Sequence, residues 1–214
     1  MNNFKLLAGI LVFGSLWGFS ECIIGSGINE LGLPSGAIMT GFFAIAFLVI
    51  SRRIYQKPGM QLGMGLVAGG LRLFNPFIGC HLCSALAIMA EGVIFEALWY
   101  KISADFSELK TPTMQVSIGI LSGYFVYIGG YIVTQILTPI ISGPGFFIGN
   151  LIAIMPNILS SGLLPAIIGA FVIPVVLLIK KLDIKLKDRL YYPTTIGVSA
   201  FCWLFVVGYW LLLT

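Results

Sequence analysis

Charged residues are scarce in this chain of 214 residues: only 9% are Asp, Glu, Lys or Arg, while 58% are hydrophobic. A soluble domain averages about 25% charged residues, so the composition excludes an ordinary soluble fold. It also excludes intrinsic disorder, which requires low hydrophobicity and high charge. Glycine is abundant, with 26 residues, as in closely packed membrane helices. The composition therefore predicts an all-α, polytopic transmembrane helical bundle embedded in the lipid bilayer.

Several sequence motifs that carry catalysis are also absent. The chain contains no G-x-x-x-x-G-K-[ST] loop, no G-x-S-x-G and no H-E-x-x-H, which are motifs of phosphate binding, serine hydrolysis and zinc proteolysis. No surface pattern of basic and aromatic residues indicates a nucleic-acid partner. We therefore exclude an ATPase on this chain and expect a non-enzymatic protein without a resident cofactor.

The lengths of the hydrophobic runs predict six core spans and a seventh, since a spanning helix needs roughly 20 apolar residues. The spans are expected at 4–24, 34–51, 58–74, 77–100, 113–137, 158–179 and 192–213. A broken or re-entrant piece at 146–155 precedes the sixth span, because Pro156, Asn157 and Pro165 interrupt a run too long for one crossing. We expect a single integral-membrane domain over 1–214, with a core bundle at 1–182 and an extra span at 190–214.

The placement of the positive charges predicts the orientation of the chain. If the amino terminus is cytoplasmic, eleven of the twelve Lys and Arg residues fall on the cytoplasmic side: Lys5, Arg52, Arg53, Lys57, Lys101, Lys110, Lys180, Lys181, Lys185, Lys187 and Arg189. This distribution follows the positive-inside rule. It predicts a multi-pass protein of a prokaryotic plasma membrane, with its carboxyl terminus outside.

A few polar residues within the spans are not explained by the orientation. Glu21, Arg72, Asn75, His81 and Glu91 all fall in the outer half of the predicted bundle. A charged side chain at membrane depth costs about 3 kcal/mol or more unless it is paired or faces a cavity. We therefore predict that these residues line an outward-facing substrate pocket. The alternative is a structural ion pair between Arg72 and Glu21 that ties two helices together.

Two asparagines near the broken segment are further candidate binding residues. Asn150 and Asn157 flank the expected break, and broken helices at substrate sites present free backbone groups. The alternative for Asn157 is a local one, in which its side chain caps the start of the sixth span. Tyr124, Tyr127 and Tyr131 recur at helical spacing in the fifth span, where a packed stripe is favoured over a cavity wall.

The run Cys80-His81-Leu82-Cys83 is the sharpest local signal. Thiolate and imidazole groups bind soft or borderline metal ions, so these residues are candidate metal ligands, and a metal or haem cofactor is an open alternative. A disulfide between Cys80 and Cys83 is a second interpretation. Small buried cysteines beside a neutral histidine are a third.

Two stretches resemble the substrate-binding S components of energy-coupling factor transporters. They are 57–70 (Lys-Pro-Gly-Met-Gln-Leu-Gly-Met-Gly-Leu-Val-Ala-Gly-Gly) and 156–181, which runs from Pro-Asn to Lys-Lys. The resemblance implies a membrane subunit that binds a vitamin or other small micronutrient from outside. It also implies docking on a transmembrane coupling subunit with cytoplasmic ATPases, and an outer loop at 25–33 that closes over the ligand. Gly14-xxx-Gly18 is the nearest equivalent of the family's docking pattern.

Two other function classes remain open at this point. The first is a membrane metal-binding or thiol-redox protein that uses Cys80, His81 and Cys83. The second is a proton-coupled secondary transporter in which Glu91 carries the proton, since intramembrane carboxylates form proton relays in transporters.

Overall fold

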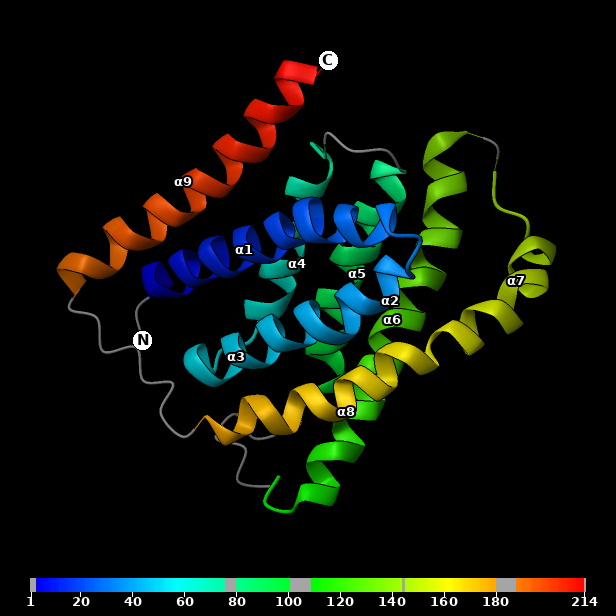
Figure 1. Ribbon diagram of the computed structural model, residues 1–214, viewed down its shortest axis with the longest axis horizontal. Helices are drawn as coiled ribbons and strands as arrows, with labels where there is room; N and C mark the ends of the chain where they lie inside the picture. Colours follow the sequence, from blue (N-terminus) through cyan, green and yellow to red (C-terminus); the bar gives the residue numbers. More distant parts are fainter. Residues whose placement is uncertain (1–2, 76–79, 101–108, 144, 180–187, 214) are drawn as a thin grey trace.

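The computed structural model describes residues 3–75, 80–100, 109–143, 145–179 and 188–213. Every secondary-structure element in these ranges is helical, which confirms the predicted all-α bundle (Figure 1). In chain order the elements are α1 (Asn3–Glu30), α2 (Ser35–Ile38), the π-helix η1 (Met39–Ala44), α3 (Ile45–Tyr55), α4 (Met60–Arg72), α5 (His81–Leu98), α6 (Pro112–Ser142), α7 (Ile148–Ser161), α8 (Leu163–Leu178) and α9 (Asp188–Leu213).

Within the described residues, six helical stretches are long and apolar enough to cross a membrane. They are Asn3–Glu30, Ser35–Tyr55, His81–Leu98, Pro112–Ser142, Ile148–Leu178 and Leu190–Leu212. The predicted third span is shorter than expected: α4 has 13 residues, or about 20 Å at 1.5 Å per residue, against a hydrocarbon core of about 30 Å. The chain is thus a multi-pass helical bundle in which α4 is a short inner helix.

Glycine allows α1 and α4 to pack closely. A Cβ atom added to Gly14 would lie 2.7 Å from Val67 Cβ, and one added to Gly18 would lie 2.8 Å from Ala68 O. The Gly14-xxx-Gly18 pattern is therefore covered by α4 inside the bundle. These two glycines thus mediate close helix contact within the bundle and are not on its surface.

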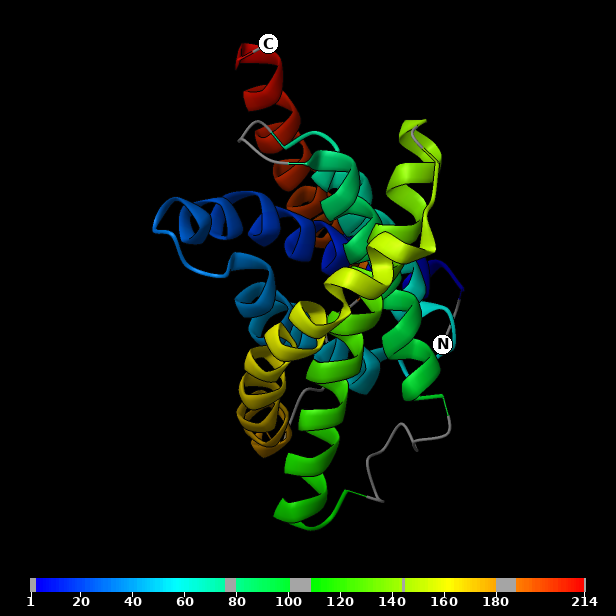
Figure 2. The same ribbon diagram turned by 90° about the vertical axis from the view of Figure 1, so that its right-hand side faces the viewer.

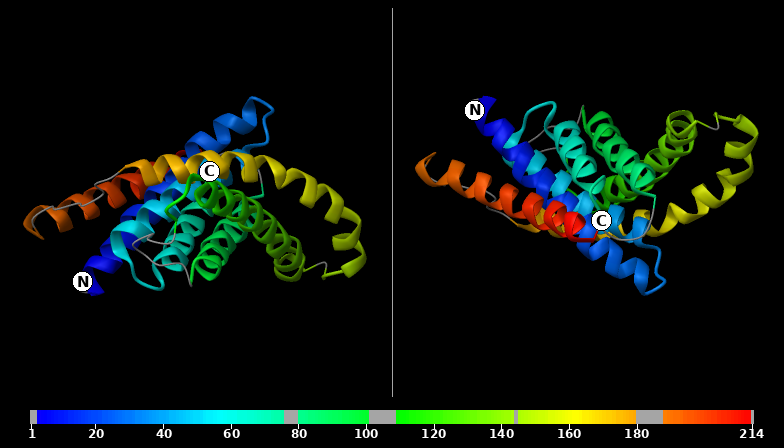
Figure 3. Two further views of the ribbon diagram at one scale, coloured as in Figure 1. Left: turned by 90° about the horizontal axis from the view of Figure 1, so that it is seen from below. Right: turned by 90° about the horizontal axis from the view of Figure 1, so that it is seen from above.

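Helix α8 crosses α6, and α9 lies along α1 at the edge of the bundle (Figures 2 and 3). At the α6–α8 crossing, a Cβ atom at Gly119 or Gly123 would overlap the facing backbone at Gly169 or Pro165. The main core lies among α1, α3, α4, α5 and α8, and its largest buried side chains include Trp17, Trp99 and Phe95.

Hydrogen bonds gather several helix ends at the end of the bundle where the amino terminus lies, here called the amino-terminal end. The Tyr191 hydroxyl lies 2.7 Å from the Tyr55 hydroxyl and donates to Lys5 O at 3.2 Å, which joins α9, α3 and α1. Arg53 Nη1 donates to Val176 O of α8 at 2.7 Å.

Basic residues cluster at this amino-terminal end. The described ones are Lys5, Arg52, Arg53, Lys57 and Lys110. Arg189 lies in the first turn of α9, while Lys101, Lys180, Lys181, Lys185 and Lys187 lie outside the described residues. The described part of the chain thus keeps the predicted positive charges together at one end.

The broken segment is present, but the break lies at Gly162 rather than at Pro156 and Asn157. Both of those residues lie within α7, so Asn157 caps no helix. A Cβ atom at Gly162 would lie 2.9 Å from the Ile128 side chain and 3.1 Å from the Tyr124 ring. The chain therefore turns at Gly162, where the glycine packs against α6 and where Pro165, early in α8, removes one backbone N–H donor of the helix.

The first connection is also shorter than predicted. The expected outer loop at 25–33 is helical as far as Glu30, where α1 ends, and only 31–34 link α1 to α2. The outer loop that the resemblance places at 25–33 is therefore a connection of four residues, 31–34.

Candidate functional site

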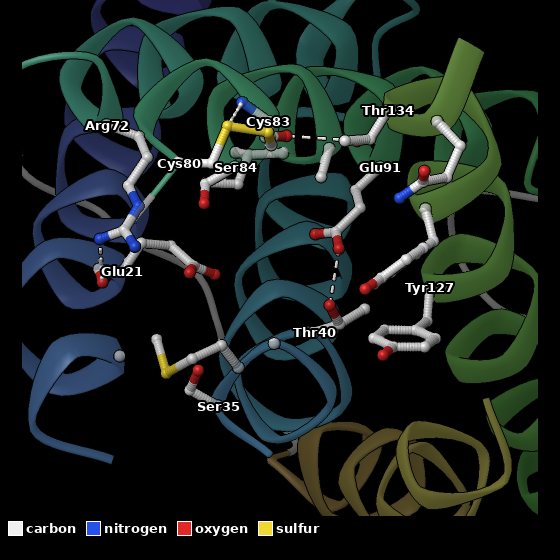
Figure 4. Close-up of a pocket in the computed structure, with 17 residues that line it drawn as sticks. Glu21, Ser35, Thr40, Arg72, Cys80, Cys83, Ser84, Glu91, Tyr127 and Thr134 are labelled. Atoms are coloured by element: carbon white, nitrogen blue, oxygen red, sulfur yellow. Dashed lines mark hydrogen bonds between the residues drawn. A yellow bond between two sulfur atoms is a disulfide. The ribbon is translucent and has the colours of Figure 1, made fainter. Parts of the chain in front are cut away.

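A cavity of about 370 Å³ opens between α1, α2, η1, α4, α5 and α6, far from the amino-terminal end (Figure 4). Its polar lining residues are Glu21, Ser35, Thr40, Arg72, Ser84, Glu91, Tyr127, Tyr131, Thr134 and Gln135, together with Cys80 and Cys83. Small-molecule sites start near 300 Å³, so the volume suits a small ligand. Predicted pocket residues from three different spans therefore meet around one space.

Glu91 is the most deeply placed carboxylate of this cavity, and its side chain is 5% exposed. Thr40 Oγ1 donates a hydrogen bond to Glu91 Oε1 at 2.6 Å, and the two side chains point toward one another (Figure 4). The second oxygen, Oε2, is buried and has no hydrogen-bond partner within the described part of the chain. An unsatisfied buried acceptor is costly, so Oε2 is a ready contact for a ligand donor.

The π-helical turn η1 carries Thr40 and Met39 into the cavity. A π-turn adds a residue to the helical repeat and occurs frequently at functional sites. Gly41 within the turn lets α8 approach, because a Cβ atom there would lie 2.9 Å from Pro165 Cα. Sequence reasoning missed Thr40, and its only signal was a hydroxyl group within an apolar run.

Glu21 and Arg72 lie side by side but form no ion pair. Arg72 Nη1 donates to the backbone oxygen of Glu21 at 2.9 Å, while Trp17 Nε1 donates to Glu21 Oε1 at 3.3 Å. Figure 4 shows both side chains reaching toward the cavity. Arg72 therefore ties α4 to α1, as the structural alternative expected, through the backbone carbonyl of Glu21.

Cys80 and Cys83 form a disulfide at the start of α5, and both line the cavity. Cys80 Sγ also accepts a hydrogen bond from Cys83 N at 3.2 Å, which caps the helix. In this form neither sulfur is the thiolate that a metal requires. Among the described residues, no group of three or more His, Cys, Asp or Glu is placed to hold a metal ion. The predicted metal site at Cys80, His81 and Cys83 is replaced by a disulfide.

Four of the seven predicted substrate-binding residues lie away from the cavity. His81 and Asn75 do not line it, although Asn75 is only 1% exposed. Asn150 instead lines a separate hollow of about 320 Å³ between the end of α6 and α7. Asn157 is exposed on α7. Of the seven, Glu21, Arg72 and Glu91 line the cavity.

Two tyrosines of α6 form part of the cavity wall. Tyr127 and Tyr131 have ring centroids 5.8 Å apart, and both line the cavity. They reach it because Gly130 lies against α5, where a Cβ atom would be 3.1 Å from Glu91 Cγ. The prediction of a packed stripe holds for Tyr124, which contacts Gly162, but not for these two.

No family model, curated protein or solved structure matches this chain. The candidate site therefore stands on its own geometry: a small cavity, two buried carboxylates, one guanidinium and a neighbouring disulfide.

Proposed function

We propose that this chain is a membrane-embedded binding subunit that captures a small micronutrient from outside the cell. The observation that carries the proposal is Glu91 Oε2, which has no hydrogen-bond partner among the described residues and lies in a cavity that also contains Glu21 and Arg72. Intramembrane ionisable residues mark substrate pathways, since their burial is costly without a function. The chain acts as a transport subunit rather than as an enzyme.

Two features support an outward-facing cavity. The basic residues gather at the amino-terminal end, and the positive-inside rule assigns such an end to the cytoplasm. The Cys80–Cys83 disulfide lies beside the cavity at the opposite end, and disulfides persist in oxidising compartments. Charge and redox chemistry thus favour the same orientation, with the amino terminus cytoplasmic.

The energy for release comes from a separate module in this proposal. The stretches that resemble energy-coupling factor S components fall in α4 and in α7–α8, on either side of the bundle core. Such a subunit docks on a transmembrane coupling protein driven by cytoplasmic ATPases. Because α4 covers Gly14 and Gly18, the docking face lies on another surface of the bundle.

Native mass spectrometry of the purified full-length protein tests the capture step. We expect a small molecule to copurify with the wild type and with Glu30→Gln, whose carboxylate is exposed at the end of α1. Glu91→Gln and Arg72→Ala should each lose that molecule. If both variants retain it at wild-type occupancy, the cavity is not the binding site.

Uptake into sealed vesicles tests the energy source. Vesicles that contain this chain alone should not concentrate the copurified molecule, whereas vesicles with the coupling and ATPase subunits should. Uptake by the chain alone, driven by a proton gradient and abolished in Glu91→Gln, would instead favour a proton-coupled secondary transporter.

Thiol–disulfide exchange is a second candidate function, favoured by the disulfide at the start of α5. A thiolate of a partner dithiol attacks one sulfur, forms a mixed disulfide and releases the other cysteine as a thiolate, which takes up a proton. The second partner thiol then completes the exchange, so the partner becomes a disulfide and Cys80 and Cys83 become thiols. Maleimide labelling after equilibration in glutathione buffers measures this exchange. A pair that stays oxidised in millimolar reduced glutathione is structural.

A further inference from the structure

The acceptor groups of the cavity outnumber its cationic donors. Its formally charged lining residues are Glu21, Glu91 and Arg72. Arg72 Nη1 donates to the backbone carbonyl of Glu21 and not to a carboxylate. Two carboxylates therefore share one guanidinium at membrane depth, where uncompensated charge is costly.

The two oxygens of Glu91 indicate which kind of ligand group the cavity favours. Thr40 Oγ1 donates to Glu91 Oε1, while Oε2 has no donor among the described residues although the side chain is only 5% exposed. A carboxylate oxygen accepts hydrogen bonds only, so its complement is an N–H or O–H group. Hydrogen bonds between ionised partners are about twice as strong as neutral ones, which favours a charged N–H donor.

The tyrosine wall adds a second preference for positive charge. Tyr127 and Tyr131 line the cavity that also contains Glu91, with their ring planes tilted by 43°. Aromatic faces attract ammonium and guanidinium groups through the ring quadrupole, most strongly where water is excluded. Carboxylates and aromatic rings together form the lining that binds organic cations.

We infer that the cavity selects a small organic cation whose N–H group donates to Glu91 Oε2 beside Tyr127 and Tyr131. This inference rests on the proposed binding function and specifies the ligand class for that same site. Arg72 and Ser84 remain available for an anionic or carbonyl group elsewhere on the ligand. One positive charge on the ligand balances the two carboxylates against the guanidinium.

Three probes that share one ring and differ in charge test the inference: benzylammonium, benzyl alcohol and benzoate. Binding to the full-length protein in lipid nanodiscs is measured by saturation-transfer NMR. We expect benzylammonium to bind most tightly and benzoate most weakly. Absence of benzylammonium binding at millimolar concentration, or tighter binding of benzoate, overturns the inference.

Variants of Glu91 and Tyr131 test whether these residues cause the preference for a cation. Glu91→Gln keeps an acceptor for Thr40 and should weaken benzylammonium binding about tenfold or more, with little change for benzyl alcohol. Glu30→Gln is the matched control and should bind like the wild type. Tyr131→Phe should retain the cation and Tyr131→Leu should weaken it. An unchanged charge order in Glu91→Gln contradicts the assignment.

The outcomes separate this inference from the proposed uptake function. A cation preference without any coupled uptake leaves the cation site intact and overturns the transport role. Copurification and coupled uptake of an anionic molecule would support the uptake function and overturn the cation preference.

Discussion

Glu91 and Glu96 lie on the same helix, five residues apart, and have opposite surroundings. Both oxygens of Glu96 accept backbone N–H groups from the start of α4, one from Gly59 and one from Leu62, the latter at 2.9 Å. Glu91 has Thr40 on one oxygen and nothing on the other within the described residues. Glu96 therefore has a structural role at the start of α4, whereas Glu91 has an oxygen that a ligand can contact.

The two arginine sites repeat the contrast. At the amino-terminal end, Arg52 and Arg53 donate to the backbone oxygens of Trp99 and Val176, and so fasten α3 to α5 and α8. Arg72 fastens α4 to α1 in the same manner, but it also lines the cavity. At the amino-terminal end the arginines therefore join helices, while Arg72 at the other end joins two helices and also lines the cavity.

Glu96→Ala should give the largest loss of stability. The substitution leaves two N–H groups at the start of α4 without their acceptor, and we expect a loss of about 2 kcal/mol in the free energy of unfolding. Thermal unfolding of the protein in nanodiscs measures it, and Glu96→Gln should recover part of the loss. An unchanged unfolding temperature in Glu96→Ala would show that Glu96 does not stabilise the start of α4.

Arg72→Met should cost less, about 1.5 kcal/mol, because a single hydrogen bond to Glu21 O is lost while the aliphatic contact is kept. The same variant should also lose the copurified ligand. Arg53→Met is its counterpart at the amino-terminal end and should lose comparable stability without affecting the ligand. Equal effects of both variants on ligand binding would argue against a distinct site.

Removal of the disulfide should have a smaller effect. Cys80→Ser with Cys83→Ser opens a loop of only a few residues. Closing a short loop costs little chain entropy, so we expect a loss of less than ~2 kcal/mol, the lower end of what disulfides contribute. The start of α5 keeps a serine cap at Cys80 in this variant. A large drop in the unfolding temperature would show that the pair holds the helix start in place.

Glu91→Gln should leave stability within about 0.5 kcal/mol of the wild type, or raise it, because it removes an uncompensated buried charge while keeping an acceptor for Thr40. Unfolding temperature and ligand occupancy are measured on the same sample. Loss of occupancy without loss of stability is the expected signature of a binding residue. A strongly destabilised protein would place Glu91 with Glu96 as a structural group.

The site was only partly predictable, for reasons that particular residues illustrate. Glu21, Arg72 and Glu91 stand out because charge within an apolar run is visible in one dimension. Thr40 does not stand out, because a hydroxyl group is unremarkable in a span. The spacing of Tyr131 is visible in the sequence, but it predicts packing, and only the fold brings this ring to the cavity. The prediction that Asn157 lies at a helix break was wrong. Pro156 predicts a break there, but α7 continues through both residues and ends at Ser161.

The amino-acid sequence by itself determined the membrane class, the all-α fold, the position of most spans and the grouping of basic residues. These properties follow from run length and from the cost of moving a charge out of water, which are local. Only the tertiary structure decided that Cys80 and Cys83 join, that α4 covers Gly14, and that η1 turns Thr40 toward Glu91. These arrangements depend on which helix faces meet, and helix packing between distant segments sets them.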